Sequence, residues 1–296
     1  MSVLLPQSVA LCVPAFRESL VGFASAISAL DPAPGALLAV DDGSGDGTDV
    51  RLQEAGFEVI IHEQNRGLGA ARNTLWQRAE ELGFSAVAYL DADVHPSPDY
   101  LSRVCSLFGS DEFAGVGGRN MDIHPQGRAD RWRARFWPQQ LGEQTLMNAP
   151  MLIGACASYR ISALRDVEGF EPEHRTHGED VDVGRRLRAY GHRLLYEPDL
   201  VVRHTREDTE LALLRGCYRH CHEGMRATLR TPGAGQEPFS LVFGMSRKWL
   251  RAPLASLLRR RDLKEAVLGS AACSAGMLGY LVAWVGASKA PRERSM

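Results

Sequence analysis

The first half of the chain alternates short apolar runs with stretches of helical periodicity. The apolar runs have the length of buried strands and occupy residues 8–14, 36–40, 57–62, 85–90 and 114–119. Helical patterns follow three of these runs, over residues 20–30, 67–82 and 98–108. Strands that alternate with helices at this spacing predict βαβ units and a mainly parallel sheet. The predicted fold class is therefore α/β.

The second half of the chain is less regular. Residues 121–151 have weak periodicity, which predicts a mobile loop or an insertion. The apolar pattern then resumes over 153–161, and short strands are predicted over 192–196 and 200–202 and helices over 180–190 and 207–229. A Pro- and Gly-rich break at 231–238 follows. We place a domain boundary there, between a domain of residues 1–230 and a helical C-terminal extension of residues 231–296.

The C-terminal extension contains a long uncharged stretch. No charged residue occurs from 266 to 288, and arginines or lysine lie on both sides of the stretch, at 259–261 and at 289–294. Its length is close to the roughly 20 apolar residues that span a bilayer. Glycine, serine and alanine make it only modestly hydrophobic, so a buried or amphipathic helix, a membrane span and an interfacial helix all remain open. Residues 259–288 are thus a candidate membrane-contacting segment.

The composition narrows the functional classes. Of the 296 residues, 45% are hydrophobic and 24% are charged, as in a globular protein with a sizeable core. The net charge of −2 gives no reason to expect a nucleic-acid partner. Six scattered cysteines form no dense disulfide framework, and the N-terminal stretch lacks the basic start of a signal peptide. We therefore expect a cytoplasmic protein, with attachment at the cytoplasmic face of a membrane left open.

The triplet Asp91-Ala92-Asp93 follows the apolar run at 85–90. Carboxylates at the end of a buried strand emerge where open α/β sheets bind their ligands. Oxygen ligands suit Mg²⁺ or Mn²⁺, which bind through one or two carboxylates together with substrate phosphates. The triplet therefore suggests a metal-bridged diphosphate, although Asp-x-Asp alone is also common in turns.

Three other predicted strands also end in polar or Gly-rich motifs. These motifs are Val13-Pro14-Ala15-Phe16-Arg17-Glu18, Val40-Asp41-Asp42-Gly43-Ser44, and Asn65-Arg66-Gly67-Leu68-Gly69-Ala70-Ala71-Arg72-Asn73. Because the strands are parallel, their carboxyl ends should meet at one edge of the sheet. Four such motifs in order are much harder to attribute to chance than the triplet alone.

Together with Gly178-Glu179-Asp180, these motifs resemble those of the family 2 glycosyltransferases. The resemblance covers about residues 8–205 and is weaker in the acceptor half. It implies a GT-A fold, which is a Rossmann-like, mostly parallel sheet flanked by helices. It also implies a nucleotide-diphosphate sugar donor and inversion at the anomeric carbon.

The resemblance assigns the nucleoside of the donor to Pro14, Ala15, Phe16, Glu18, Asp42 and Ser44. In this scheme Asp42 accepts a hydrogen bond from the base, Phe16 stacks on it, and Glu18 binds the ribose hydroxyls. The alternatives are a turn-capping role for Asp42, which fits Asp46 better, core packing for Phe16, and a solvated helix-start carboxylate for Glu18.

The diphosphate is assigned to the glycine-rich loop and the triplet, through Arg66, Gly67, Arg72, Asp91, Ala92 and Asp93. Arginine neutralises phosphate charge, and glycine lets the backbone approach a ligand. The alternative for the arginines is a solvated helix residue, which fits Arg72 better than Arg66. Asp93, and less directly Asp91, would hold Mn²⁺ or Mg²⁺. His204, after a predicted strand, is either a further metal or phosphate ligand or a surface histidine.

Catalysis is assigned to Asp180, with Glu179 beside it. The resemblance implies that Asp180 is the general base that takes the proton of the acceptor hydroxyl. Both residues open a predicted helix, where capping carboxylates are common, and capping is the alternative role.

Two further segments invite other interpretations. Cys217-Tyr218-Arg219-His220-Cys221-His222 suggests zinc, but no second pair at finger spacing follows, so helix packing is favoured. The segment 131–137 alternates arginine with tryptophan and phenylalanine. The net charge argues against nucleic acid, and we expect an acceptor-side loop whose aromatic rings meet sugar rings or lipid headgroups.

The leading hypothesis is an inverting, metal-dependent glycosyltransferase that acts on a glycan or lipid-linked acceptor. The Gln-x-x-Arg-Trp motif of processive synthases is absent at 215–219, which favours single additions. A sugar-phosphate nucleotidyltransferase is the alternative enzyme, but its Gly-rich loop is missing after the first strand. A non-catalytic sugar-nucleotide scaffold is the third hypothesis, and the presence of both Asp93 and Asp180 argues against it.

Overall fold

The computed structural model describes residues 4–109, 112–123, 126–230 and 263–289. By its internal contacts the chain divides into two compact units. The first comprises Met1–His124 and Pro138–Arg206, and the second comprises Pro125–Trp137 and Glu207–Met296. The first unit contains every residue predicted to bind the donor or to act as base. The domain boundary expected at 231–238 lies outside the described residues, so the division at residue 230 stays a prediction.

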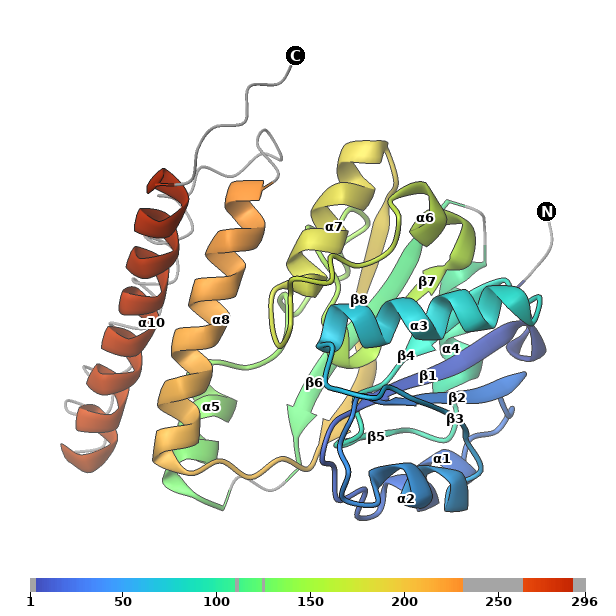
Figure 1. Ribbon diagram of the computed structural model, residues 1–296, viewed down its shortest axis with the longest axis horizontal. Coiled ribbons are helices and arrows are strands. Elements are labelled where there is room, and N and C mark those ends of the chain that lie inside the picture. The colour runs from blue at the N-terminus through green and yellow to red at the C-terminus, as the bar shows by residue number, and fades with distance from the viewer. Residues whose placement is uncertain (1–3, 110–111, 124–125, 231–262, 290–296) are drawn as a thin grey trace. The chain divides into compact units, whose positions relative to one another are not determined.

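The first unit is an α/β fold built on one eight-stranded sheet with the order β3-β2-β1-β4-β7-β6-β8-β5 (Figure 1). Its strands are β1 (Val9–Ala15), β2 (Ala36–Asp41), β3 (Glu58–Ile61), β4 (Ala86–Tyr89), β5 (Val94–Pro96), β6 (Gly115–Asp122), β7 (Ala157–Arg160) and β8 (Leu194–His204). Its α-helices are α1 (Phe23–Ser28), α2 (Thr48–Glu54), α3 (Leu68–Glu81), α4 (Tyr100–Phe108), α6 (Ile161–Asp166) and α7 (Glu179–Tyr190). Short 3-10 helices occupy Pro6–Ser8 and Gly154–Cys156.

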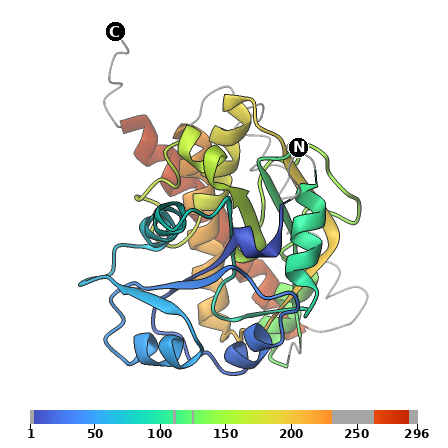
Figure 2. The same ribbon diagram turned by 90° about the vertical axis from the view of Figure 1, so that its right-hand side faces the viewer.

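The first four strands form the parallel half of the sheet. β1 pairs with β2 and β4, and β2 pairs with β3, all in parallel. Every residue of β1 and β4 is buried, because helices cover both faces; α3 and α4 lie on opposite sides of the sheet (Figure 2). This double burial explains why these strands are continuous apolar runs. It also places the carboxyl ends of β1, β2 and β4 at one edge, as predicted.

The other half of the sheet is mixed. β7 is antiparallel to β4 and β6, whereas β6 and β8 are parallel. β5, which begins directly after Asp93, pairs antiparallel with the end of β8 so that Val94 lies opposite His204. Asp122 of β6 lies opposite His204 on its other side. The sheet therefore brings Asp93, Asp122 and His204 together from three strands.

Two sequence-based expectations about secondary structure were wrong. The two short strands expected at 192–196 and 200–202 are one strand, β8, which continues through Pro198. Its neighbour β6 shifts register between Gly117 and Arg119, and a Cβ at Gly118 would lie 1.7 Å from the Leu200 carbonyl oxygen. This irregularity admits a proline into a paired strand.

The second error concerns residues 121–151, which do not form one loop. They contain the end of β6 and helix α5 (Arg128–Phe136). The many arginines of α5 masked its helical pattern. The expected acceptor-side loop at 131–137 is therefore also wrong: it lies largely in this helix, and Trp132 is fully buried in the core of the second unit.

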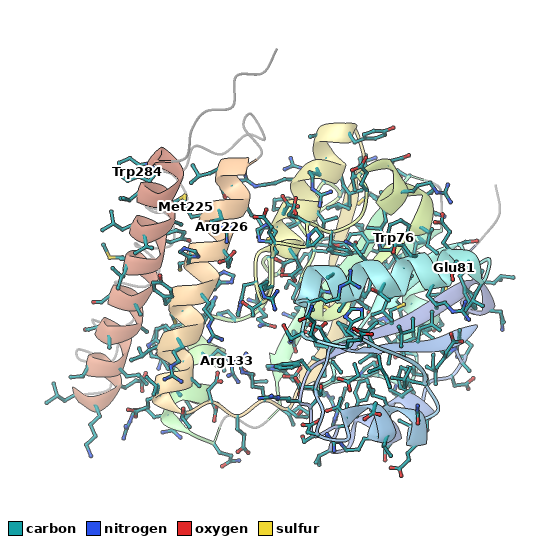
Figure 3. All side chains as sticks on the ribbon, viewed as in Figure 1. Trp76, Glu81, Arg133, Met225, Arg226 and Trp284 are labelled. Atoms are coloured by element: carbon teal, nitrogen blue, oxygen red, sulfur yellow. The ribbon has the colours of Figure 1, made fainter. Side chains whose placement is uncertain are left out.

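The second unit consists of α5, α8 (Glu210–Arg230) and α10 (Leu263–Lys289). α8 and α10 run side by side, with Met225 on α8 and Trp284 on α10 (Figure 3). Cys217 and Cys221 are buried in this unit's apolar core together with Cys273. Helix packing, the favoured interpretation of the cysteine segment, is thereby confirmed.

The centre of the sheet should dominate the stability of the first unit. Leu11, in β1, has no exposed surface. We expect Leu11→Ala to lower the free energy of unfolding by about 2–5 kcal/mol, through lost burial and a residual cavity. Val50→Ala, at a position 49% exposed on α2, should change it by about 0.5 kcal/mol or less. Urea unfolding followed by circular dichroism measures both, and similar losses for the two variants would contradict the assigned core.

Candidate active site

The carboxylate of Asp42 holds the start of the glycine-rich loop. Its two oxygens accept hydrogen bonds from the backbone N–H groups of Arg66 and Gly67, at 2.9 and 2.7 Å. His62 Nδ1 lies 2.6 Å from Asp42 Oδ1. Asp42 therefore connects two strand-end loops and is not a local turn cap. Asp46 has that role instead, since its Oδ1 accepts hydrogen bonds from the N–H and hydroxyl of Thr48.

The glycines of this loop allow another segment of the chain to pack closely against its backbone. Gly67 has φ +97°, and a Cβ there would lie 2.8 Å from the Arg175 Cα. The N–H groups of Leu68 and Gly69 donate to the carbonyls of Arg175 and His174, at 2.9 and 3.1 Å. A Cβ at Gly69 would also clash with backbone. The loop is thus fixed against the segment that leads into α7.

The burial of the two predicted phosphate-binding arginines is the reverse of what the sequence suggested. Arg66, favoured as the ligand-facing residue, is exposed, whereas Arg72, for which a solvated position seemed the better alternative, is only 2% exposed. Arg72 Nη1 donates to Glu179 Oε1 at 2.7 Å, and Nη2 donates to Asp91 Oδ1 at 3.3 Å. The expectation that Arg72 is the more solvated of the two arginines was therefore wrong. The sequence around Arg72 gave no sign of its burial, because the two acids that pair with it lie far away in sequence.

Arg72 is closely surrounded by side chains and backbone of the first unit. Its guanidinium lies 5.5 Å from the ring centre of Tyr89 and 5.6 Å from that of Phe170. A Cβ at Gly154 would lie 2.8 Å from both terminal nitrogens of Arg72. The Tyr89 hydroxyl donates to the Arg72 carbonyl at 2.8 Å. The guanidinium is thus enclosed by two rings, one glycine and two carboxylates.

Asp180 and Glu179 lie side by side but in different environments. Glu179 is paired with Arg72, and its side chain is 5% exposed. Asp180 is half-buried, and its Oδ2 accepts from the Gly154 N–H at 3.4 Å. Burial raises the pKa of the Asp180 carboxyl, and the charge of Arg72 opposes this shift only partly. A raised pKa suits a group that must accept a proton, because a stronger base is the result.

A second group of acids surrounds His204. His204 Nε2 lies 3.0 Å from Asp93 Oδ2, and Nδ1 lies 3.2 Å from Asp122 Oδ1. His204 is 6% exposed, so it is not a surface histidine. Burial opposes ionisation of Asp93, but the hydrogen bond and charge of His204 lower its pKa overall.

Glu18 shares this acidic environment. It precedes α1 and belongs to no helix, so the interpretation as a helix-start carboxylate is wrong. Burial raises the pKa of Glu18 to about 7, with further contributions from the charges of Asp93 and Asp91. Three carboxylates thus compete for ionisation at one edge of the sheet, which is the electrostatic condition that a bound cation relieves.

The residues present fit a hard divalent cation. In the described ranges, no three His, Cys, Asp or Glu side chains already converge as a complete ligand set. Mg²⁺ and Mn²⁺ do not require one, since they bind through one or two carboxylates plus substrate phosphates. The Asp91 and Asp93 side chains remain 38% and 31% exposed, so they are accessible to such an ion.

The nucleoside residues lie at the ends of β1 and β2. Pro14 and Ala15 are buried at the end of β1, and the Ser44 hydroxyl accepts the Arg17 N–H at 2.8 Å. Phe16 is 40% exposed, with the Arg17 guanidinium 5.0 Å from its ring centre. Core packing, the alternative for Phe16, is therefore excluded.

Two participants had not been singled out from the sequence. Asp122 orients His204, and its signal was an acid just beyond the predicted strand at 114–119. Gly154 donates to Asp180 and makes room for Arg72, and no pattern in the sequence marks it.

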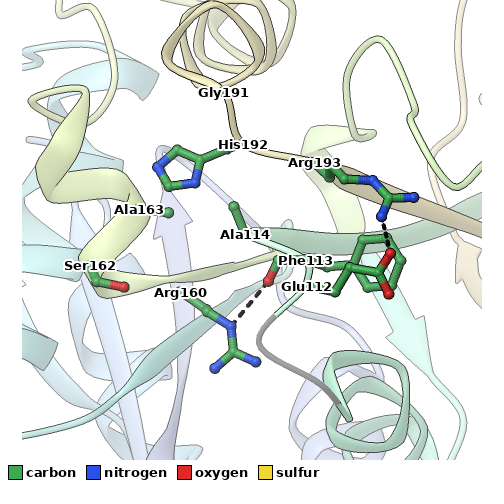
Figure 4. Close-up of a pocket in the computed structure, with 9 residues that line it drawn as sticks. All are labelled: Glu112, Phe113, Ala114, Arg160, Ser162, Ala163, Gly191, His192 and Arg193. Atoms are coloured by element: carbon green, nitrogen blue, oxygen red, sulfur yellow. Dashed lines mark hydrogen bonds and ion pairs between the residues drawn. The ribbon is translucent and has the colours of Figure 1, made fainter.

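A surface pocket lies at the opposite edge of the sheet, near the amino ends of β6 and β8 (Figure 4). Its cationic side chains already have protein partners. Arg193 pairs with Glu112, His192 with Asp166, and Arg160 Nε donates to the Phe113 carbonyl. We assign no ligand to it.

Removing Arg72 should destabilise the first unit strongly. We expect Arg72→Met to lower the free energy of unfolding by about 3–5 kcal/mol, because it leaves Glu179 buried without a partner. The double variant Arg72→Met/Glu179→Gln should recover much of this loss. Arg78→Met is the matched control on α3, since the 35% exposed Arg78 should contribute about 0–1 kcal/mol. Equal losses for Arg72→Met and Arg78→Met in urea unfolding would contradict a buried ion pair.

Glu18 should give stability a distinct pH dependence. The folded protein holds the Glu18 proton up to about pH 7, whereas the unfolded chain releases it near pH 4.5. Its contribution is therefore complete at low pH and is lost as the pH rises through about 7. Without added metal, the urea midpoint of the wild type should fall over this range relative to Glu18→Gln. Parallel curves for the two proteins would refute this shift, and exposed Glu54→Gln serves as control.

The comparisons with known proteins agree with this geometry. The family model described as "Glycosyl transferase family 2" matches residues 12–168, more than half of the chain. A pre-mycofactocin glycosyltransferase of Mycobacterium tuberculosis is 34% identical over 185 residues, which cover 57% of this chain and 37% of that relative. The chain thus spans little more than a third of that relative's length. The O-antigen chain rhamnosyltransferase WbaN of Salmonella anatum is 24% identical over 226 residues, covering 71% and 70% of the two chains.

Solved structures share the fold. Residues 1–349 of S. aureus TarS in complex with UDP match with a TM-score of 0.60 at 15% identity, covering 97% of this chain and 94% of that chain. GalNAc-T7 with UDP, GalNAc and Mn²⁺ matches with a TM-score of 0.53 at 14% identity, covering 68% and 43%. The GT-A fold expected from the sequence is confirmed. The strand-end motifs, the sheet and the family match lead to one conclusion: this chain belongs to the family 2 glycosyltransferases.

Proposed function

We propose that this chain is an inverting glycosyltransferase that uses a nucleotide-sugar donor, depends on a divalent metal, and transfers one sugar to an acceptor hydroxyl. The observation that carries the proposal is the pairing of buried Arg72 with both Asp91 and Glu179. This pairing connects the Asp91-Ala92-Asp93 triplet, which is expected to hold the donor diphosphate, to Glu179 and Asp180, which are expected to act on the acceptor hydroxyl. Both halves of a displacement reaction are therefore held in one rigid cluster.

The donor diphosphate is proposed to bind beside the triplet. Asp93 and Asp91 would hold Mn²⁺ or Mg²⁺, with His204 as a further ligand, and Ala92 would lie against the donor. When bound, the ion acts as a Lewis acid on the departing nucleoside diphosphate. The structural neighbour GalNAc-T7 was crystallised with UDP and Mn²⁺, which supports this choice of ion. Exposed Arg66 remains available to the phosphates, whereas Arg72 is occupied by its two acids.

The nucleoside is proposed to lie across the ends of β1 and β2. The exposed ring of Phe16 offers a stacking surface, and the backbone of Pro14 and Ala15 lies next to it. Glu18 would accept hydrogen bonds from the ribose hydroxyls. Asp42 and Ser44 fix the loops that form this surface. Asp42 would therefore contact the base while it still accepts the hydrogen bond from the Gly67 N–H.

Asp180 is proposed as the general base. It would take the proton of the acceptor hydroxyl as that oxygen attacks the anomeric carbon from the face opposite the leaving diphosphate. The N–H of Gly154 orients its carboxylate, and burial raises its pKa. Glu179 would assist by fixing the start of α7 through its pair with Arg72.

We also propose that the acceptor is a glycan or a lipid-linked molecule and that the enzyme works at the cytoplasmic face of a membrane. All six cysteines are buried and unpaired, which fits a reducing compartment. Residues Leu263–Gly286 of α10 are long and apolar enough to cross a membrane by length and composition. The names of the two relatives refer to different molecules, pre-mycofactocin and an O-antigen chain, so they do not identify the acceptor of this chain.

A thermal-shift panel tests the donor site. UDP-, GDP- and dTDP-sugars are added with and without Mn²⁺, because a ligand that binds only the folded state raises the melting temperature. We expect one nucleotide class to raise it, and to do so more strongly with Mn²⁺. Asp93→Asn should lose the part of the shift that depends on Mn²⁺. No shift with any donor would overturn the proposed site.

Asp180→Asn tests the base. We expect this variant to keep the donor-induced thermal shift and to lose about 10²–10⁴-fold in kcat, the usual contribution of a general base. Asp49→Asn, at a half-buried position on α2, is the control and should keep full activity. Wild-type turnover by Asp180→Asn would refute the assignment. Donor binding without turnover in the wild type would favour a sugar-nucleotide scaffold.

A further inference from the structure

Helix α10 has no charged face beyond its first turn. Within Leu263–Gly286, an 18-residue window has a mean hydropathy of 1.6, and no residue from 266 to 288 is charged. An amphipathic helix of a soluble protein buries one stripe and exposes a polar one. A helix that is apolar all round needs cover on every side, either from protein or from lipid.

One side of α10 is covered by α8. Ala272, Cys273 and Tyr280 are buried in the same apolar core as Cys217 and Cys221 of α8. The two backbones are in close contact, since a Cβ at Gly279 would lie 2.3 Å from the Tyr218 carbonyl oxygen. This contact near the middle of both helices fixes them alongside each other.

The opposite side of α10 is exposed and strongly apolar. In the C-terminal half of the helix, its large apolar side chains are between 37% and 54% exposed and comprise Met277, Leu278, Leu281, Val282, Trp284 and Val285. They recur at helical spacing, so they form one continuous face, which we call the outer face. Trp284 of this face lies on the side of α10 away from α8 (Figure 3). An apolar face of this kind marks an interaction surface.

The charged residues of α8 restrict the orientation that α10 can take in a membrane. Arg215 and Arg219 are exposed on α8, and Glu223 and Arg226 lie one and two turns further along. If α10 crossed the bilayer with α8 packed on it, these four charges would enter the hydrocarbon, where charged side chains are costly. An orientation in the membrane plane keeps α8 on the water side and immerses only the outer face.

The sequence at the two ends of α10 fits an anionic surface. Arg259-Arg260-Arg261 precedes the helix, and Lys289, Arg292 and Arg294 follow or end it. Basic residues beside an interfacial helix are attracted to anionic headgroups, and tryptophan prefers the headgroup level.

We infer that α10 lies in the plane of an anionic membrane and immerses its outer face, with α8 towards the water. This inference rests on the proposed location at a membrane, but not on the proposed chemistry. A second copy of the chain covering the outer face, or a helix that crosses the bilayer, would be a different outcome of the test.

The full-length protein is mixed with vesicles of phosphatidylglycerol and phosphatidylcholine in equal parts, and with phosphatidylcholine vesicles, and binding is measured by flotation. We expect the wild type to float with the anionic vesicles and to bind about tenfold more weakly in 0.5 M salt or to neutral vesicles. Leu278→Glu/Leu281→Glu should bind the anionic vesicles at least about tenfold more weakly. Val50→Glu/Leu82→Glu, which charges two exposed apolar positions of the first unit, is the matched control and should bind as the wild type.

Any of three other results would overturn the inference. Equal flotation of the outer-face variant and the control would mean that this face does not meet lipid. Resistance of the wild type to alkaline carbonate extraction from cell membranes would mean that α10 spans. A wild-type dimer that the outer-face variant converts to monomer, without vesicle binding, would mean that a second copy covers the face. The donor-induced thermal shift, measured on the same variants, reports separately on folding and on the proposed donor site.

Discussion

The buried guanidinium of Arg72 is the constraint on which the geometry of the site depends. A charge withdrawn from water must be paired, and the partners of Arg72 come from the end of β4 and the start of α7. One side chain therefore fixes the relative position of three elements that are distant in sequence. Because Asp91 and Glu179 adjoin Asp93 and Asp180, the spacing between the proposed donor side and the proposed acceptor side is set before any ligand arrives.

On the other side of the site, the carboxylate of Asp42 likewise fixes separate segments of the chain relative to each other. Its carboxylate satisfies two backbone N–H groups of the glycine-rich loop, and the glycines let that loop contact the segment before α7. Polar groups at the strand ends thus have protein partners already. A preorganised arrangement of this kind loses little conformational entropy on binding and holds its dipoles in place during the reaction.

Local sequence patterns predicted much of this molecule. The central strands were visible because burial on both faces makes them continuous apolar runs, and the strand-end motifs indicated the edge where the site lies. What the patterns missed depends on contacts between distant segments. The burial of Arg72 requires Glu179, the continuity of β8 through Pro198 requires the irregularity at Gly118, and the three-residue β5 exists only because β8 lies beside it. None of these has a signal within its own segment.

The pairing of β5 with β8 has a consequence for dynamics. β5 is an edge strand of three residues, and its pairing of Val94 with His204 helps to keep Asp93 beside His204, together with the hydrogen bonds that the Thr205 N–H and hydroxyl donate to the Asp93 carbonyl. Short edge strands open at the low end of a protein's range of local stabilities. The backbone amides of this strand pair should therefore exchange with solvent sooner than those of β1. The end of the sheet proposed to hold the metal is built on a segment that can fray without unfolding the core, so entry and departure of the proposed diphosphate need not disturb the central strands.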